Sequence, residues 1–430
     1  MKLTNFAGAT AILEHKGIRV LFDPWLDDGI FHGAWYHYPP LAPQAPDLGR
    51  IDYVYISHIH EDHCSAGTLR RVNSDAEVIL MEKNPNFVAR FLDAHGFRFK
   101  AVHQIKPRTE KELRPGLSVG MLEADPGNEM SHIIDSALLM RWDGFTVYNA
   151  NDCQPYEGGL AYIVENYGRV DLALIPYSGG SGYPSCYTNL SPEQKLAEKR
   201  RILDARLDNF ARTVGRLDPR FVVPFADQYV VAGSRSNLNR FISHPPCPGA
   251  VRDRLSREGL IERLLLLNSG QAFDFEAGAK SPDEPYRDFS EQDRERYIEA
   301  CLLDKPYEHE RVSFDFGVAV DRLLSHARER LWTRQQRNGY MPGTSLYLDI
   351  ADRKRRYQIR LDRAGVQEQD WSAPLQEPYL RVAGSHTLMI MLLLGHMSWN
   401  IADAALFLDY ERVPNVYDPE MYVCLNYLRV

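Results

Sequence analysis

Residues 52–63 read Asp52-Tyr53-Val54-Tyr55-Ile56-Ser57-His58-Ile59-His60-Glu61-Asp62-His63, an apolar strand that runs directly into a group of metal-binding side chains. In an extended chain, residues two positions apart point to the same face, so the imidazoles of His58 and His60 can reach one cation. Where the strand ends and the chain turns, Asp62 and His63 can reach a second cation beside the first. Three histidines and an aspartate within six residues favour metal ligation over a structural role. The segment therefore predicts a dinuclear metal site.

Two further candidate ligands follow in the chain. His132 opens the stretch HIIDS (132–136), just before a predicted pair of strands. Asp152 ends the stretch YNAND (148–152), directly after the next predicted strand. The order of these two residues after the histidine cluster supports the prediction of a metal site.

The order of these side chains resembles the metallo-β-lactamase superfamily. There the first metal takes the first two histidines of the cluster and a later histidine. The second metal takes the aspartate and last histidine of the cluster, and a later aspartate lies between the metals. The resemblance implies an αββα sandwich and this set of ligands: His58, His60 and His132 for metal one, Asp62 and His63 for metal two, and Asp152 between them.

One ligand of that superfamily has no counterpart here. Its final histidine follows a late strand, and the corresponding stretch of this chain reads FVVPFADQ (221–228), with Ala226 in the expected place. The adjacent Asp227 is either a substitute carboxylate ligand or a surface residue. Losing an imidazole makes the second site richer in oxygen donors, which favours iron or manganese over zinc.

The rest of the chain divides into two predicted α/β parts. Short apolar runs predict strands at residues 17–22, 52–57, 77–81, 136–141, 145–149, 171–175 and 221–224. A charged periodic stretch over 191–217 predicts a long helix, with Ser191-Pro192 at its start. A polar, proline-bearing stretch then marks a boundary. We therefore predict a metal domain at 1–277, a linker at 278–290 and a C-terminal α+β domain at 291–430.

The C-terminal part carries its own pattern. It predicts helices over 290–303 and 315–332, strands over 345–349 and 356–361, and helices around Leu388 and over 399–408. The two strands and the apolar run at 388–394 are similar to sterol-carrier-like domains, which often cover apolar ligands. The alternative is that these strands and this helix simply form a core.

Composition limits the classes of partner. The 430 residues carry a formal charge of −8 and no basic block, which argues against a nucleic-acid partner. The longest apolar run is far shorter than the roughly 20 residues that span a bilayer. Six scattered cysteines without CxxC pairs suit reduced thiols. We therefore expect a cytoplasmic, non-membrane protein, with a homodimer as the default assembly.

A closer resemblance extends over nearly the whole chain. The histidine cluster, the Asn151-Asp152-Cys153 turn, SGGSGYP (178–184) and the region from Ser398 to Asn426 are similar to the non-Rieske part of CMP-N-acetylneuraminate hydroxylases. The Rieske ligand pairs, Cys-x-His and Cys-x-x-His, do not occur in this sequence. Any oxidation would therefore use the dinuclear site itself. Diiron hydroxylases of antibiotic biosynthesis, in the chloramphenicol and platensimycin pathways, are similar precedents.

Two segments are candidate walls of a substrate pocket. The aromatic-rich stretch WLDDGIFHGAWYHY (25–38) could bind an apolar substrate through Trp35, Tyr36 and Tyr38, or could pack the loop down on the protein. The stretch SGGSGY (178–183) could point backbone N–H groups at an anion or could form a tight turn. Tyr177 and Tyr183 are further candidates for hydrogen bonding at the pocket.

The sequence supports two catalytic hypotheses. In the first, two iron ions (zinc or manganese being the alternatives) use dioxygen to hydroxylate a C–H bond of a largely apolar, natural-product-like small molecule. Electrons would come from an external reductase, because the chain shows no flavin or iron–sulfur motif. In the second, the metals lower the pKa of a bridging water towards about 7, and the protein hydrolyses a phosphodiester, lactone or amide. A vestigial site in a binding protein is a third interpretation, which the nearly complete ligand set disfavours.

Overall fold

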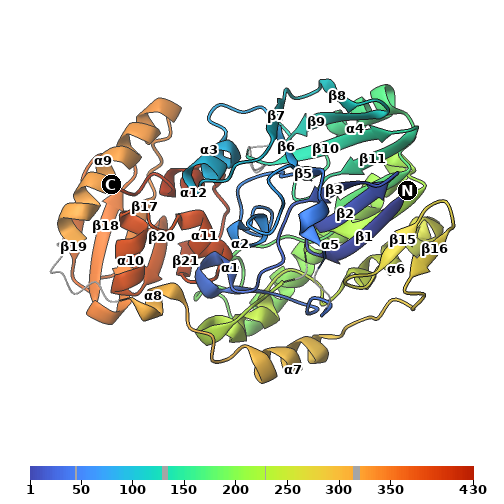
Figure 1. Ribbon diagram of the computed structural model, residues 1–430. Helices are drawn as coiled ribbons and strands as arrows, with labels where there is room; N and C mark the ends of the chain where they lie inside the picture. The colour runs from blue at the N-terminus through green and yellow to red at the C-terminus, as the bar shows by residue number, and fades with distance from the viewer. Residues whose placement is uncertain (44–45, 128–133, 228, 313–319) are drawn as a thin grey trace.

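A computed structural model describes residues 1–43, 46–127, 134–227, 229–312 and 320–430 of the chain. Two parts lie side by side in Figure 1: a layered sandwich that holds the N-terminus, and a smaller unit that holds the C-terminus. Helix α11 (Trp399–Ala404) lies on the side of the smaller unit that faces the sandwich. No helix of the described residues combines the length and the apolar character needed to cross a membrane.

Within the described ranges, eight strands form the first sheet, in the order β16-β15-β1-β2-β3-β5-β6-β7. Their bounds are Lys2–Ala7 (β1), Thr10–His15 (β2), Ile18–Phe22 (β3), Tyr53–Tyr55 (β5), Glu77–Met81 (β6), Ala101–Ile105 (β7), Ala272–Asp274 (β15) and Ala279–Ser281 (β16). Strands β3, β5, β6 and β7 are parallel, so their carboxyl ends share one edge. Helices α2 (Ala66–Leu69) and α3 (Phe87–Ala94) cover the outer face. The histidine cluster leaves this sheet at the carboxyl end of β5.

Six strands of the described chain form the second sheet, in the order β13-β12-β11-β10-β9-β8. Their bounds are Glu110–Arg114 (β8), Leu117–Glu123 (β9), Ser136–Trp142 (β10), Phe145–Asn149 (β11), Leu172–Pro176 (β12) and Phe221–Phe225 (β13). Helices α4 (Glu157–Tyr167) and α5 (Pro192–Leu217) pack on its outer face. Helix α5 begins at the predicted Ser191-Pro192 pair, and the structure adds a capping box between Ser191 and Gln194.

The run of apolar residues in β10 shows why the sequence folds into layers. Leu138 and Met140 point into the core between the two sheets, whereas Ala137 and Leu139 point to the helices on the outer face. Because both faces of the strand are buried, its sequence is continuously apolar rather than alternating. The arrangement confirms the predicted αββα sandwich, with α2 and α3 on one side and α4 and α5 on the other.

In the C-terminal unit, five described strands form a sheet in the order β19-β18-β17-β20-β21. Their bounds are Ser345–Ile350 (β17), Arg355–Arg360 (β18), Gln367–Gln369 (β19), Tyr379–Gly384 (β20) and Asp409–Val413 (β21). The helices from the boundary onwards are α7 (Glu291–Cys301), α8 (Glu308–Arg311), α9 (Val320–Asn338), α10 (His386–Leu393), α11 and α12 (Pro419–Leu425). Residues 388–393 of α10 are all buried, so this helix is a core element of the unit.

The junction between the two parts contains the aromatic segment. Helix α1 (Ile30–Gly33) and strand β4 (Trp35–His37) lie there, and β4 pairs with β14 (Tyr229–Val231). The buried cluster that holds Trp35 also includes Leu388 of α10, so one apolar core runs through the junction. Strand β16 pairs with β15, so the first sheet includes residues of the predicted linker at 278–290. Of the helix predicted at 315–332, residues 315–319 lie outside the described residues.

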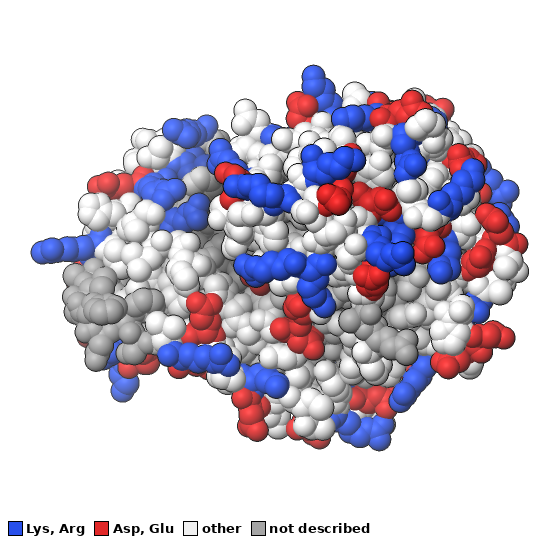
Figure 2. All heavy atoms as spheres, viewed as in Figure 1, with Lys and Arg blue, Asp and Glu red and all other residues white. Residues whose placement is uncertain are grey.

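The remaining described helix of the sandwich is α6 (Arg252–Arg257), which packs near α5. On the face drawn in Figure 2, acidic and basic side chains are interspersed over the described surface. On this face, the acidic side chains are therefore not gathered into a single patch.

Candidate metal centre

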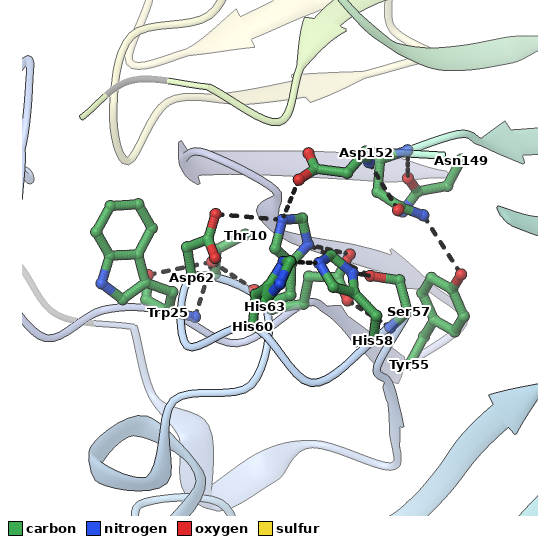
Figure 3. Close-up of polar contacts among 12 residues, drawn as sticks. Thr10, Trp25, Tyr55, Ser57, His58, His60, Asp62, His63, Asn149 and Asp152 are labelled. Carbon is green, nitrogen blue, oxygen red and sulfur yellow. Dashed lines mark hydrogen bonds and ion pairs between the residues drawn. The ribbon is translucent and has the colours of Figure 1, made fainter. Parts of the chain in front are cut away.

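The histidine cluster changes from an extended to a turned backbone within a few residues. Strand β5 ends at Tyr55, and the chain then turns so that the amides of His63 and Cys64 donate to the carbonyl of His60, at 3.0 and 2.8 Å. The turn brings Asp62 and His63 back beside His58 and His60. The three imidazoles consequently point toward one another, as Figure 3 shows.

One group of donors is the pair His58 and His60. The Nε2 atom of His58 lies 2.8 Å from Nδ1 of His60. On its far side, His60 Nε2 lies 2.8 Å from Oδ1 of Asn400, which can only accept, so Nε2 carries the proton and donates. The Nδ1 atom of His58 is in turn 2.9 Å from the hydroxyl oxygen of Ser57. With the outer nitrogens occupied in this way, the two inner nitrogens can offer lone pairs to one cation.

A second group of donors surrounds His63. Its Nε2 atom lies 3.4 Å from Oδ2 of Asp62 and 3.3 Å from Oδ2 of Asp152. Ligands about 2.1 Å from one metal lie about 3.0–3.4 Å from each other, so these spacings fit the edges of a coordination polyhedron. The donor atoms of His58, His63 and Asp152 all lie within 4.8 Å of one another. Asp152 is thus placed where the two groups meet.

Asp23 orients His63 from behind, and sequence reasoning gave it no role. Its carboxylate is fully buried; Oδ2 lies 3.1 Å from Nδ1 of His63, and Oδ1 accepts from the Ser57 amide at 2.7 Å. A carboxylate on Nδ1 fixes the tautomer that leaves Nε2 available to a metal. The available signal was an acidic residue at the buried end of β3, just before Pro24.

The electrostatics of the site favour a bound cation. Burial by itself would lower the pKa of His63, but the charges of Asp152, Asp62 and Asp23 raise that pKa well above its ordinary value. Burial, followed by the charge of Asp152, raises the pKa of Asp135 well above its usual range. Among the described residues, Asp62 Oδ1 and Asp135 Oδ1 are buried and have no hydrogen-bond partner. Buried carboxylates are normally paired or bound to metals, so this donor set fits metal ions.

The turn after β11 positions Asp152. Asn151 adopts a left-handed backbone, with φ of 44°, which asparagine tolerates better than most residues. Its side chain donates to the carbonyl of Ser136 at 2.8 Å and accepts from the Asp152 amide at 2.7 Å. The side-chain oxygen of Asn149 accepts from the Asn151 amide at 3.0 Å. These bonds fix the turn and hold Asp152 over His63.

Two predicted ligands remain, His132 and Asp227, and the structure describes only Asp227. His132 lies outside the described residues, so its place in the first group stays a prediction. Asp227 follows β13 and is buried, which excludes the surface interpretation, and its Oδ1 lies 3.2 Å from Nδ1 of the buried His244. Burial raises the pKa of Tyr229, and Asp227, Asp62 and Asp152 raise it further. The Tyr229 phenol thus lies in the field of both Asp227 and the metal-binding carboxylates, and ligation by Asp227 stays a prediction.

The predicted pocket aromatics lie at the junction between the two parts. Trp35 stacks on Tyr229 with ring centroids 3.4 Å apart, and its Nε1 donates to the Ala404 carbonyl at 2.9 Å. The others are placed as follows: Tyr36 is half-buried beside Tyr297 of the α7 segment, Tyr38 is buried against Phe289 and Tyr297, Tyr177 is buried near Asp227, and Tyr183 donates to Glu198. Their contact with a substrate stays a prediction.

Comparison with known proteins agrees with this geometry. A family model described as Beta-lactamase superfamily domain matches residues 18–223. The chain is 30% identical over 230 residues to a protein of Mycolicibacterium smegmatis named as a Rieske 2Fe-2S iron-sulfur protein, covering 53% of this chain and 43% of that one. It is 28% identical over 284 residues to the cytidine monophosphate-N-acetylneuraminic acid hydroxylase of Xenopus laevis, covering 59% and 46%. The chain thus spans about half the length of the curated relatives it matches.

Solved structures with similar folds include a hydrolase and a hydroxylase. The isothiocyanate hydrolase from Delia radicum gut bacteria has 18% identity and a TM-score of 0.46, covering 64% of this chain and 99% of its own. CmlA, a diiron β-hydroxylase from Streptomyces venezuelae, has 18% identity and a TM-score of 0.41, covering 62% and 53%. The matched residues include both groups of metal donors described above. Asn400 and Asp227 lie outside the match. The chain therefore contains a β-lactamase superfamily domain, as the order of its ligands predicted, and the candidate metal centre lies within it.

Proposed function

We propose that the protein is a non-heme diiron oxygenase that hydroxylates a C–H bond of a small molecule. The observation that carries the proposal is the donor set around His63, in which one imidazole is joined by the carboxylates of Asp62 and Asp152. Oxygen-rich sites with few imidazoles favour iron or manganese over zinc. Two bound irons would supply the redox chemistry that activates dioxygen.

The chain's own residues would hold that centre in place. Asn400 and Ser57 fix the outer nitrogens of His60 and His58, and Asp23 fixes the outer nitrogen of His63. Such contacts set the tautomer and direction of each imidazole, so they prepare the site before any metal binds. The aromatic side chains at the junction belong to a buried apolar core, and we propose that the substrate has an apolar body that lies next to them.

The reaction needs an external source of electrons. One oxygen atom enters the C–H bond and the other leaves as water, a balance that takes two electrons and two protons per dioxygen. The sequence has no Rieske ligand pair, whereas the similar mycobacterial protein is named for such a cluster. We therefore propose that a separate reductase, or another electron carrier, delivers both electrons. The hydroxylase name of the Xenopus laevis relative supports this reaction class.

A metal-dependent hydrolase is the second candidate. The observation that favours it is the position of Asp152, whose carboxylate lies within 4.8 Å of donor atoms in both groups. A carboxylate between two metals supports a dinuclear site that polarises a water molecule, which is the requirement for cleaving a phosphodiester, lactone or amide. This chemistry needs no side-chain nucleophile.

Metal content and the response to oxygen separate the two candidates. The protein should be purified without oxygen and loaded with either ferrous iron or zinc. The number of ions bound per chain and the affinity should then be compared between the two metals. The proposal expects two irons per chain and an oxygen-dependent change in visible absorption after reduction. Two zinc ions held in preference to iron, with no optical change on adding oxygen, would overturn the oxygenase and leave the hydrolase.

A further inference from the structure

Arg206 lies on α5, beside the glycine turn that follows β12. Burial lowers the pKa of its guanidinium, and the charge of Asp152 opposes that effect. No hydrogen bond or ion pair joins the guanidinium to any residue in the described parts of the chain. The side chain is half-buried, and its nitrogen atoms are not sealed off by protein. A cation in this situation lacks the partner that burial normally requires.

The guanidinium rests flat on the glycine turn that follows β12. A methyl group built on Gly179 would lie 3.5, 3.6 and 3.7 Å from Nη2, Cζ and Nε of Arg206. Nearly equal distances to three atoms of the planar group mean that its face, rather than its edge, meets the turn. The N–H groups project from the edge of the plane, so they point away from Gly179 and stay available to another group.

The same turn is fixed from two sides, by Tyr229 and by Asp403. A methyl group on Gly180 would lie only 2.7 Å from the phenolic oxygen of Tyr229, so the turn packs closely on this ring. The charges of Asp62 and Asp152 also raise the pKa of Tyr229. On the other side, the Gly182 amide donates to Oδ2 of Asp403 at 3.1 Å. The turn is therefore held between Tyr229 and α11.

A second polar group in this turn also lacks a partner. The hydroxyl of Ser178 is buried and has no hydrogen bond to any residue that the structure describes. Ser178 immediately precedes the glycine on which Arg206 rests. Buried polar groups are nearly always hydrogen-bonded, so the unpartnered Ser178 hydroxyl, next to the glycine that the guanidinium contacts, points to a missing acceptor.

We propose that Arg206 and Ser178 bind an anionic group of the substrate, a carboxylate or a phosphate, beside the dinuclear centre. The guanidinium fork matches the paired oxygens of either anion, and the Ser178 hydroxyl adds a further donor. The substrate class is then an organic acid or phosphate ester whose anionic end lies on the glycine turn and whose reacting end faces the metals. This inference rests on the proposed function in one respect: it assumes that the substrate reacts at the metal centre.

Binding of simple anions to the metal-loaded protein tests the proposal. Inorganic phosphate and acetate should be titrated by calorimetry into the unmodified protein, Arg206→Met, Arg206→Lys and the control Arg212→Met, with metal content verified for each. Arg212 is an exposed residue of the same helix. We expect Arg206→Met to weaken anion binding about 10- to 100-fold, Arg206→Lys to weaken it less, and Arg212→Met to leave it unchanged. The probe that binds more tightly distinguishes a phosphate ester from a carboxylic acid.

Stability provides an independent readout. An arginine kept for the fold would lose stabilising contacts when replaced, whereas a half-buried arginine without a protein partner contributes little to stability. We therefore expect Arg206→Met to leave the melting temperature within about 2 °C of that of the unmodified protein. Failure of both probes to bind, or anion affinity in Arg206→Met equal to that of the unmodified protein, would overturn the proposal. If that happens while the oxygen-dependent absorption change persists, the proposed function stands and only the anion site is wrong.

Discussion

Replacing Asn400 with alanine should weaken metal binding by His58 and His60 while leaving the donors around His63 intact. Asn400 reaches the centre from the first turn of α11, and its Oδ1 accepts from His60 Nε2 at 2.8 Å. Its own backbone amide donates to Asn426, an interaction that alanine retains. The substitution therefore removes one hydrogen bond to a metal-binding imidazole with little other change at the helix terminus.

The expected magnitude follows from what that hydrogen bond does. Without the acceptor, the His60 ring can rotate or change tautomer, and Nδ1 no longer faces Nε2 of His58. Loss of such an orienting contact typically costs about 10- to 100-fold in metal affinity, or about 1.4–2.7 kcal/mol. Asn400→Asp should instead preserve or increase the affinity, because a carboxylate accepts the same proton with a charge-assisted bond.

Competition with a chromophoric chelator, using cobalt as an optical probe, can resolve the two binding steps. One step should weaken in Asn400→Ala while the other keeps the affinity of the unmodified protein. Asn426→Ala is the matched control, since it alters the support of the same helix terminus without touching His60. Two unchanged steps in Asn400→Ala would refute the role given to Asn400, and equal losses in the control would show that the helix position, not the hydrogen bond, matters.

Three other substitutions test separate parts of the site. Asp23→Asn should lower the affinity of the step that involves His63 about 10- to 100-fold, because the orienting charge is lost; a chelator titration that finds no change would contradict this role. Asp152→Ala should reduce the content of both metals, because its carboxylate lies within reach of both groups; elemental analysis showing two metals per chain would refute the shared position. Gly180→Ala should destabilise the fold by about 1–3 kcal/mol through its clash with Tyr229, and adding Tyr229→Phe should recover much of that loss in thermal unfolding.

The sandwich was predictable because its signals are local. Continuous apolar runs predicted β6 and β11 with the bounds that the structure shows, and the Ser191-Pro192 pair predicted the start of α5. The histidine cluster was equally local, since its ligands are close in sequence and follow a buried strand. In the C-terminal sheet, only strands β17 and β18 were predicted, together with the apolar helix α10.

The supporting residues were not predictable in the same way. Asn400 is separated from His60 by 340 positions, and nothing in its local sequence indicates contact with an imidazole. Arg206 belongs to a highly charged helix, in which an arginine is normally expected to be exposed to solvent. Asp23 differs from an ordinary turn aspartate only by being fully buried. Each role arises from packing between elements that are distant along the chain, which local periodicity does not encode.

Helix α11 connects the C-terminal unit to three parts of the site at once. Asn400 contacts a metal-binding imidazole, Asp403 accepts from the glycine turn, and the Ala404 carbonyl accepts from Trp35. The helix is itself anchored by Trp399, whose ring is buried and donates to the Leu428 carbonyl at 3.0 Å. A shift of this helix would therefore change the ligand orientation, the anion position and the aromatic wall together. We infer that the C-terminal unit is an integral part of the metal centre, because the contact that orients His60 comes from it.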